Sequence, residues 1–261
     1  LISSSCCAVI PQIFFKVVKY SDKFGDFQAC FSVSSATATY FFSSFPLIAL
    51  CCCVFLALYN DFDKATETHC GVRNVLPSIS VAIGDFHWGR LIWKSLIFAH
   101  LPPRVLAAFA YAQLFRVPLE NIVQTYFRYL TCFLNLLELF CLGLLSAVSS
   151  KDDHYRHVLA FSTFQIAGMI HGALHVVLYH ITGISDFNVH SRKSYRVKKI
   201  CYKLSILFLA ICMLLYHRHN TYCEPYVFSM FAFFEYLIVL TNILFHATFR
   251  FDFYGLRLFV F

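Results

Sequence analysis

Six long apolar runs set the strongest limit on how this chain can fold. Each comes close to the roughly 20 apolar residues that a helix needs to cross a bilayer. A segment inside hydrocarbon must satisfy its own backbone hydrogen bonds, so runs of this length form α-helices. We therefore predict an all-α polytopic membrane protein, a bundle of about six transmembrane helices, at residues 39–59, 91–115, 126–148, 158–181, 200–216 and 225–248.

The composition supports a membrane protein and argues against a water-soluble domain. Hydrophobic residues make up 59% of the 261 residues and charged residues 13%, whereas soluble domains carry roughly 25% charged residues. The net charge of +7 does not indicate nucleic-acid binding, because the basic residues concentrate in the loops. We expect one six-helix transmembrane domain at residues 39–255, preceded by a weakly structured N-terminal extension at residues 1–38.

The distribution of Lys and Arg among the loops predicts the orientation, because cytosolic loops carry an excess of both residues. With the N-terminus in the cytosol, the cytosolic segments hold eleven of these residues and the opposite segments hold six. The densest group, Arg192 to Lys199, falls in a short loop on the cytosolic side. We therefore expect both termini in the cytosol, and loops 60–90 and 217–224 together in the lumen.

Two cysteines stand in a different setting from the others. Cysteines such as Cys51 and Cys132 lie inside apolar runs, where a thiol acts as a small hydrophobe. Cys70 and Cys223 lie in polar loops that share the oxidising lumen on this topology. We expect a disulfide between them; the alternative is two separately packed free thiols.

Polar residues inside the predicted spans are the candidates for function. Each costs a few kcal/mol in hydrocarbon unless it is paired, and the residues concerned are His100, Arg104, Asn135, Glu138, His171, His175, Glu235, Asn242 and His246. They either pair to fix helix packing or form a site. The Pro102-Pro103 pair removes two backbone donors, so we expect the second span to kink or break there.

The sequence contains no strong signal for a metal or a cofactor. His171 and His175 are four residues apart and share a helix face, which would suit two metal ligands. No Glu completes an HExxH motif, however, and no third ligand follows from the spacing. Walker, G-x-S-x-G and Rossmann motifs are also absent from usable contexts. We predict no metal and no cofactor.

The sequence resembles the post-GPI-attachment-to-proteins factor 2 family, part of the larger DRAM-like group of six-span membrane proteins. The resemblance runs from about residue 40 to residue 253 and rests on these matches: His69–Val72, Asn74, Leu76–Ser78, Ala82–Gly84, His100, Pro103, Arg104, Ala108–Tyr111, Leu134, Asn135, Glu138, His171, Arg192–Tyr195, Arg218–Asn220, Tyr222–Glu224, Glu235, Tyr236, Val239–Asn242, Phe245, His246, Asp252 and Phe253.

The resemblance implies a role in remodelling the lipid of GPI anchors in the Golgi membrane, with the endoplasmic reticulum as a second location. The family is linked to returning a saturated acyl chain to a lyso-GPI intermediate. Whether a member is the acyltransferase or a lipid-binding or scaffolding factor that assists remodelling stays open. The implied partners are the lipid of GPI-anchored proteins, an unidentified acyl donor and other GPI-remodelling proteins, without nucleic acid.

Acyl transfer to a hydroxyl needs a base and donors for the developing oxyanion. We expect His100 or His171 as the base and Glu138 or Glu235 as its orienting carboxylate. The substrate-binding candidates, among which Arg suits phosphate, are Arg104, Asn135, Arg218, His219, Asn220, Asn242 and His246. We expect His100, Arg104, Glu138 and His171 to converge in one cavity in the lumenal half. A transporter is disfavoured, because full apolar turns separate the polar residues.

Overall fold

The structure, a computed structural model, describes residues 16–19, 31–117 and 120–260. Its long helices are α1 (Ser35–Asn60), α4 (His87–Leu114), α5 (Ile122–Ala147), α6 (His154–Ile181), α8 (Val189–Tyr222) and α9 (Val227–Ala247). Its short helices are α2 (Phe62–Thr66), α3 (Ile79–Gly84), α7 (Ile184–Phe187) and α10 (Phe249–Asp252). The strands are β1 (Lys16–Lys19), β2 (Phe31–Ser34) and β3 (Leu256–Val260).

The six long helices confirm the predicted all-α membrane bundle. Each is long and apolar enough to cross a membrane, and α9 continues as a candidate span to Asp252. The largest difference concerns the segment before the fifth span. The sequence predicts a span at residues 200–216 and a loop before it, whereas helix α8 begins at Val189 and ends at Tyr222. The basic group Arg192–Lys199 is therefore helical rather than a loop, with the Asn188 side chain accepting a hydrogen bond from Ser191 N at the start of the helix.

Of the kink or break predicted at Pro102-Pro103, the break is wrong, and the kink stays a prediction. Helix α4 runs through both prolines without interruption, from His87 to Leu114. Helices that are packed against neighbours tolerate internal prolines in membranes, because the surrounding structure compensates for the missing donors. The continuity of α4 keeps Arg104, one residue beyond the pair, in a fixed register with the helices around it.

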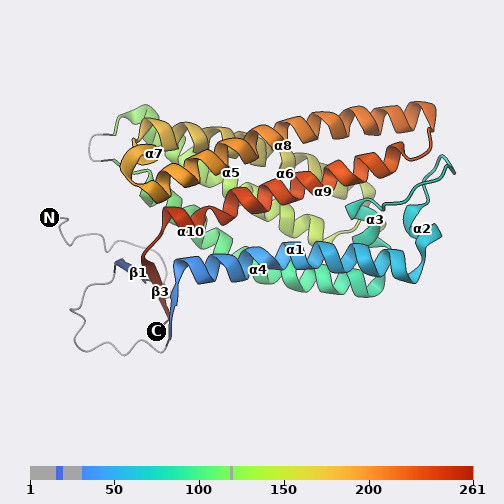
Figure 1. The fold of residues 1–261 in the computed structure, drawn as a ribbon, viewed down its shortest axis with the longest axis horizontal. Coiled ribbons are helices and arrows are strands. Elements are labelled where there is room, and N and C mark those ends of the chain that lie inside the picture. The colour runs from blue at the N-terminus through green and yellow to red at the C-terminus, as the bar shows by residue number, and fades with distance from the viewer. Residues whose placement is uncertain (1–15, 20–30, 118–119, 261) are drawn as a thin grey trace.

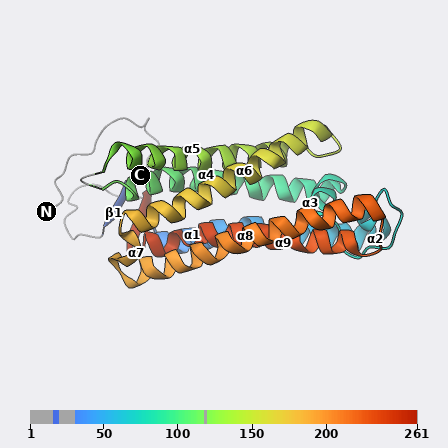
Figure 2. The same ribbon diagram turned by 90° about the horizontal axis from the view of Figure 1, so that it is seen from above.

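The long helices lie along one common direction, and their loops gather at two ends (Figure 1). We name the end with α2, α3 and the Cys70–Cys223 bond the disulfide end. The end with α7, α10 and the strands is the sheet end. Seen from above, α5 and α6 lie on one side of the bundle and α8 and α9 on the other, with α6 and α8 meeting through α7 (Figure 2). Contacts between these two sides form the site described below.

A three-stranded antiparallel sheet lies at the sheet end. Its order is β1-β3-β2, so β3 from the C-terminal region pairs with both strands that precede α1. The expected N-terminal extension, residues 1–38, lies largely outside the described residues. Its described parts are β1, β2 and the start of α1, which begins at Ser35.

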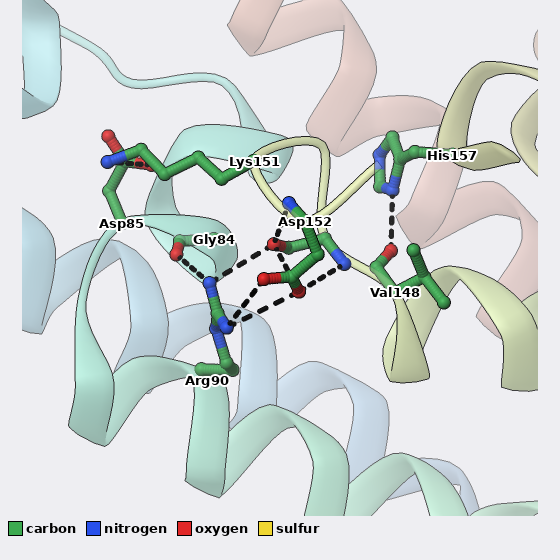
Figure 3. Close-up of polar contacts among 8 residues, drawn as sticks. Gly84, Asp85, Arg90, Val148, Lys151, Asp152 and His157 are labelled. Carbon is green, nitrogen blue, oxygen red and sulfur yellow. Dashed lines mark hydrogen bonds and ion pairs between the residues drawn. The ribbon is translucent and has the colours of Figure 1, made fainter. Parts of the chain in front are cut away.

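An ionic cluster closes the disulfide end between α4 and the loop that joins α5 to α6 (Figure 3). Arg90 donates to the Gly84 carbonyl at 2.6 Å and to the Ser149 hydroxyl at 3.1 Å, and it pairs with Asp152 at 3.4 Å. Hydrogen bonds from Ser149, together with the charge of Arg90, hold the pKa of the Asp152 carboxyl below its ordinary value. The cluster fixes the distance between the α4 and α5–α6 parts of the bundle.

Candidate functional site

A buried carboxylate, Glu138 of α5, lies at the centre of the polar cluster in the bundle. Only 1% of its surface is exposed. An isolated charge at this depth would be costly, so the neighbouring helices must supply donors. Polar side chains approach it from three sides: Oε1 accepts a hydrogen bond, whereas Oε2 has only an ion-pair contact and no hydrogen-bond partner among the described residues.

The first oxygen, Oε1, faces α4 and α9. The Asn242 amide donates to it at 2.9 Å, His246 Nε2 lies 3.5 Å away, and the Arg104 guanidinium lies 3.8 Å away. Arg104 also donates to the Asn135 side chain at 3.5 Å. Arg104 thus provides the positive charge that balances Glu138 inside the membrane, and Asn242 fixes the position of the carboxylate.

The second oxygen, Oε2, faces α6 and lies 3.3 Å from Nδ1 of His171. The approach is close because α6 has a glycine beside the carboxylate: a Cβ at Gly168 would lie 3.4 Å from the Glu138 carboxyl carbon. No partner of His171 Nε2 is found among the described residues. A carboxylate that holds one imidazole nitrogen and leaves the other free is the arrangement of a general base.

A crevice between α6, α8 and α9 reaches this cluster. It is lined on α6 by Gly168, His171 and Gly172, on α8 by Tyr202 and on α9 by His246. A Cβ at Gly172 would lie 3.0 Å from the Tyr202 ring, so a larger side chain there would push the two helices apart. The crevice is small, about 40 Å³, and His171 is among the residues that line it.

A family model, the Frag1/DRAM/Sfk1/Cwh43P N-terminal domain, matches residues 34–256 of the chain. Post-GPI attachment to proteins factor 2 from Caenorhabditis elegans is 40% identical over 215 residues, covering 80% of this chain and 82% of the relative. The Drosophila melanogaster protein of the same name is 35% identical over 214 residues, covering 82% and 84%. The chain belongs to the post-GPI attachment to proteins factor 2 family.

A Xenopus tropicalis member of the family, named Acyltransferase PGAP2, is 35% identical over 211 residues, which cover 80% of this chain and 84% of the relative. No solved structure matches the chain. The family expected from the sequence is thus confirmed, and the Glu138 cluster is drawn from residues that carried that resemblance.

Two of the expected catalytic residues, His100 and Glu235, lie outside the Glu138 cluster. His100, on the same helix as Arg104, binds the Phe42 carbonyl of α1 through Nδ1 at 2.8 Å. Glu235 accepts a hydrogen bond from the backbone N–H of Ile79 at 2.9 Å, which anchors α3 on α9. The expectation that His100 joins Glu138 and His171 is therefore wrong, because its ring turns toward α1.

The expected depth of the cluster is also corrected. Arg104 lies 17 residues from the start of α4 and ten from its end, and His171 has the same position in α6. Both helices run from the disulfide end to the sheet end (Figure 1). The cluster therefore lies nearer to the sheet end, and not in the half that faces the predicted lumen.

The remaining candidates gather at the disulfide end. Arg218 is exposed and pairs with Glu224 at 2.5 Å, and Asn220 is exposed. His219 is buried, and neither ring nitrogen has a partner among the described residues. Cys70 and Cys223 form a disulfide in the structure, which joins the loop after α2 to the end of α8.

Two groups of side chains have the ligand types of a metal site. The first, His69, Cys70 and His219, contains a sulfur that is already in the disulfide. In the second, the ligand atoms of Glu138, His171 and His246 lie within 4.8 Å of one another. The guanidinium of Arg104 beside the same carboxylate already neutralises it, so a divalent cation there would leave a net positive charge in the membrane.

A second buried cluster, which the sequence reading missed, lies at the sheet end. Lys198 of α8 forms an ion pair with Asp252 of α10, and both side chains have no exposed surface. The Ser194 hydroxyl accepts a hydrogen bond from Lys198 at 2.8 Å, and Tyr179 donates to Asp252 at 2.7 Å. The sequence predicts a loop at Lys198, because the cations around it lower the hydropathy, whereas the structure has it in α8; the match of Asp252 to the family is a usable signal for the pair.

Proposed function

We propose that this protein remodels the lipid of GPI anchors by transferring a saturated acyl chain to the free hydroxyl of a lyso-GPI. The names of its relatives support a role after GPI attachment, and one of those names supports acyl transfer. The observation that carries the proposal is the contact between Glu138 Oε2 and His171 Nδ1, which leaves His171 Nε2 free at the crevice.

In this mechanism Glu138 holds the His171 ring in the tautomer with its proton on Nδ1. His171 Nε2 takes the proton of the lyso-lipid hydroxyl while the hydroxyl oxygen bonds to the carbonyl carbon of the donor. The tetrahedral intermediate then expels the donor's leaving group, which receives the same proton from His171. Arg104 and Asn242 act as positioning residues, because they hold Glu138 and do not touch the reacting atoms.

The test uses purified protein in nanodiscs with lyso-GPI and an acyl donor, and mass spectrometry of the lipid product. We expect His171→Gln to lower the rate by about 10²-fold or more, as loss of a general base does. His180→Gln is the matched control, since His180 is exposed on the same helix. A normal rate for His171→Gln at normal abundance would contradict the mechanism.

A non-enzymatic lipid-binding factor is the second candidate. It is favoured by the pairing of Glu138 with Arg104 and Asn242, which neutralises the cluster without any substrate. In that case the purified protein would bind lyso-GPI but form no ester with any acyl donor. If His171→Gln still binds lyso-GPI but no longer transfers an acyl chain to it, the result would favour the enzyme instead.

We also propose a Golgi location with both termini in the cytosol. The sheet end carries the basic group of α8, and the disulfide end carries the bond that an oxidising lumen would maintain. Tags after Phe261 and beside Lys151 test this orientation. Only the first should be accessible to antibody when the plasma membrane alone is permeabilised, and the reverse pattern would contradict it.

A further inference from the structure

A stripe of four cations runs along the first half of α8. Arg192, Arg196, Lys199 and Lys203 follow one another at intervals of four, three and four residues. At 3.6 residues per turn this spacing places all four on one side of the helix. Arg192, Arg196 and Lys203 are exposed and Lys199 is half-buried. We call these four residues the cation stripe.

The cation stripe has no counter-charge within the described part of the chain. Helix α8 contains no acidic residue, and none of the four cations forms an ion pair with a described carboxylate. Lys198, in the same segment, turns inward and pairs with Asp252. Within the described part of the chain, no carboxylate therefore competes with an anion from outside the protein for the cation stripe.

The stripe borders the seam between α6 and α8. On the adjacent face of α8, the Tyr195 ring stacks on Tyr179 of α6 with centroids 5.7 Å apart, and Tyr202 lines the crevice. The cation stripe lies about 80° further around the helix on that same side. Lys199 lies over the Tyr195 ring, 4.2 Å from its centroid. An anion on the stripe would thus lie next to the face of α8 whose Tyr202 lines the crevice.

The cation stripe also lies at a suitable depth in the bilayer, at the edge of the hydrocarbon. The apolar part of α8 that follows it, Leu204–Tyr216, is about 20 Å long as a helix, shorter than the roughly 30 Å of hydrocarbon. Lys199 and Lys203 therefore lie at the edge of the hydrocarbon and extend their ammonium groups toward the headgroups. His171 is nearer to the sheet end of its helix than to the other end, so the stripe and the catalytic cluster belong to the same half of the bundle.

We propose that the cation stripe and the crevice together bind the acyl donor, and that this donor is an acyl thioester on a polyanionic carrier, an acyl-coenzyme A. The inference rests on the proposed function. The carrier's phosphates would bind the stripe, its flexible arm would follow the α6–α8 seam, and the thioester would lie beside His171. Four cations on one line match several phosphates better than the single phosphodiester of a phospholipid.

The transfer then balances as follows. The lyso-lipid hydroxyl oxygen bonds to the thioester carbonyl carbon, and the bond between that carbon and sulfur breaks. The hydroxyl proton passes through His171 Nε2 to the departing sulfur, so the products are the ester and the free thiol of the carrier. A thiol ionises near pH 8.5, far below an alcohol, which makes the thiolate the easier leaving group.

Binding of a non-reactive thioether analogue of palmitoyl-coenzyme A tests this proposal. The protein is placed in nanodiscs of phosphatidylcholine alone, so that no anionic lipid competes. The triple variant Arg192→Gln/Arg196→Gln/Lys199→Gln should bind the analogue at least about tenfold more weakly, because it loses charge-assisted contacts to phosphate. The matched control removes three exposed cations elsewhere that likewise form no ion pair with a described carboxylate: Lys64→Gln, Arg73→Gln and Arg116→Gln.

The outcomes separate this inference from the proposed function. Unchanged affinity of the stripe variant would overturn it, as would transfer from phosphatidylcholine to lyso-GPI when no acyl-coenzyme A is present. Weaker binding of an analogue that lacks the 3′-phosphate would support the inference. His171→Gln should bind the analogue like wild type and should transfer no acyl chain. If this variant binds the analogue and still transfers at the wild-type rate, the catalytic role of His171 is refuted, but the binding role of the cation stripe is not.

Discussion

His100 of α4 takes the place of a helical N–H that Pro46 of α1 cannot provide. The Phe42 carbonyl would normally accept from the residue four positions later, which is Pro46 and has no N–H. The His100 ring donates to that carbonyl through Nδ1 at 2.8 Å. The contact explains why His100, although only one turn from Arg104, does not join the Glu138 cluster.

This contact predicts a compensating pair of substitutions. His100→Leu leaves the Phe42 carbonyl without a donor and should cost about 1–3 kcal/mol of unfolding free energy. Pro46→Ala restores the helical donor, so the same His100→Leu change should cost much less in that background. Thermal unfolding of the purified protein in detergent measures all four members of the cycle. Additive costs would show that the carbonyl does not link the two residues.

The buried pair of Lys198 and Asp252 gives a second double-mutant cycle. Lys198→Met or Asp252→Asn alone leaves an unpaired charge among apolar rings and should cost about 3–5 kcal/mol. The double variant removes both charges and should recover part of that loss. Cellular abundance and the unfolding temperature are the readouts. A double variant as unstable as the sum of the singles would mean that the two charges do not compensate each other.

The number of spans could be predicted from the sequence, because hydropathy alone determines which runs can cross a membrane. The residues of the Glu138 cluster could also be predicted as candidates from the sequence, since intramembrane charge is rare. What could not be derived was which histidine meets Glu138. That depends on how three helices are rotated about their axes, and the missing donor at Pro46, not the spacing to Arg104, turns His100 away.

The Lys198–Asp252 pair was missed for a different reason. Six cations within the first half of α8 lower its hydropathy, so a hydropathy criterion starts the span after them. A helix can nevertheless extend well beyond the hydrocarbon, with one cation turned inward and the others outward. Helical spacing puts Lys198 on another face of α8 than the cation stripe. Its pairing with Asp252 depends on packing against α10, and packing between distant segments is not visible in a local pattern.

The disulfide predicts that replacing either cysteine lowers the stability by the same amount and that the two losses do not add. Cys70 and Cys223 are 153 residues apart, and closing a loop of that size stabilises by about 5 kcal/mol in the chain-entropy model. Cys70→Ser and Cys223→Ser should each lose this stabilisation, and the double variant should lose little more. Cys51→Ser, at an exposed free cysteine, is the control. Mass spectrometry of unreduced peptides that found both thiols free would contradict the bond.

The corner between α4 and α5 predicts a defined pH dependence. Arg128 donates to Glu120 at 2.7 and 3.2 Å and to the Ala112 carbonyl at 3.2 Å, so Glu120 holds the guanidinium that ties α5 to α4. Hydrogen bonds from Arg128, then from Thr125, lower the pKa of the Glu120 carboxyl. A carboxyl whose pKa is lower in the folded state stabilises the fold above its unfolded pKa of about 4.3, and this contribution disappears as pH falls through the folded value.

Glu120→Gln should therefore lower the unfolding temperature at pH 7, and the gap to wild type should narrow as the pH falls below about 4. Melting curves in detergent between pH 7 and pH 3 measure that gap. Glu67→Gln is the matched control, because Glu67 is exposed and forms no ion pair with the described residues. The unfolding temperature of Glu67→Gln should follow that of wild type at every pH. A gap for Glu120→Gln that stays constant down to pH 3 would mean that Arg128 is held by the Ala112 carbonyl and its packing, and not by the charge of Glu120.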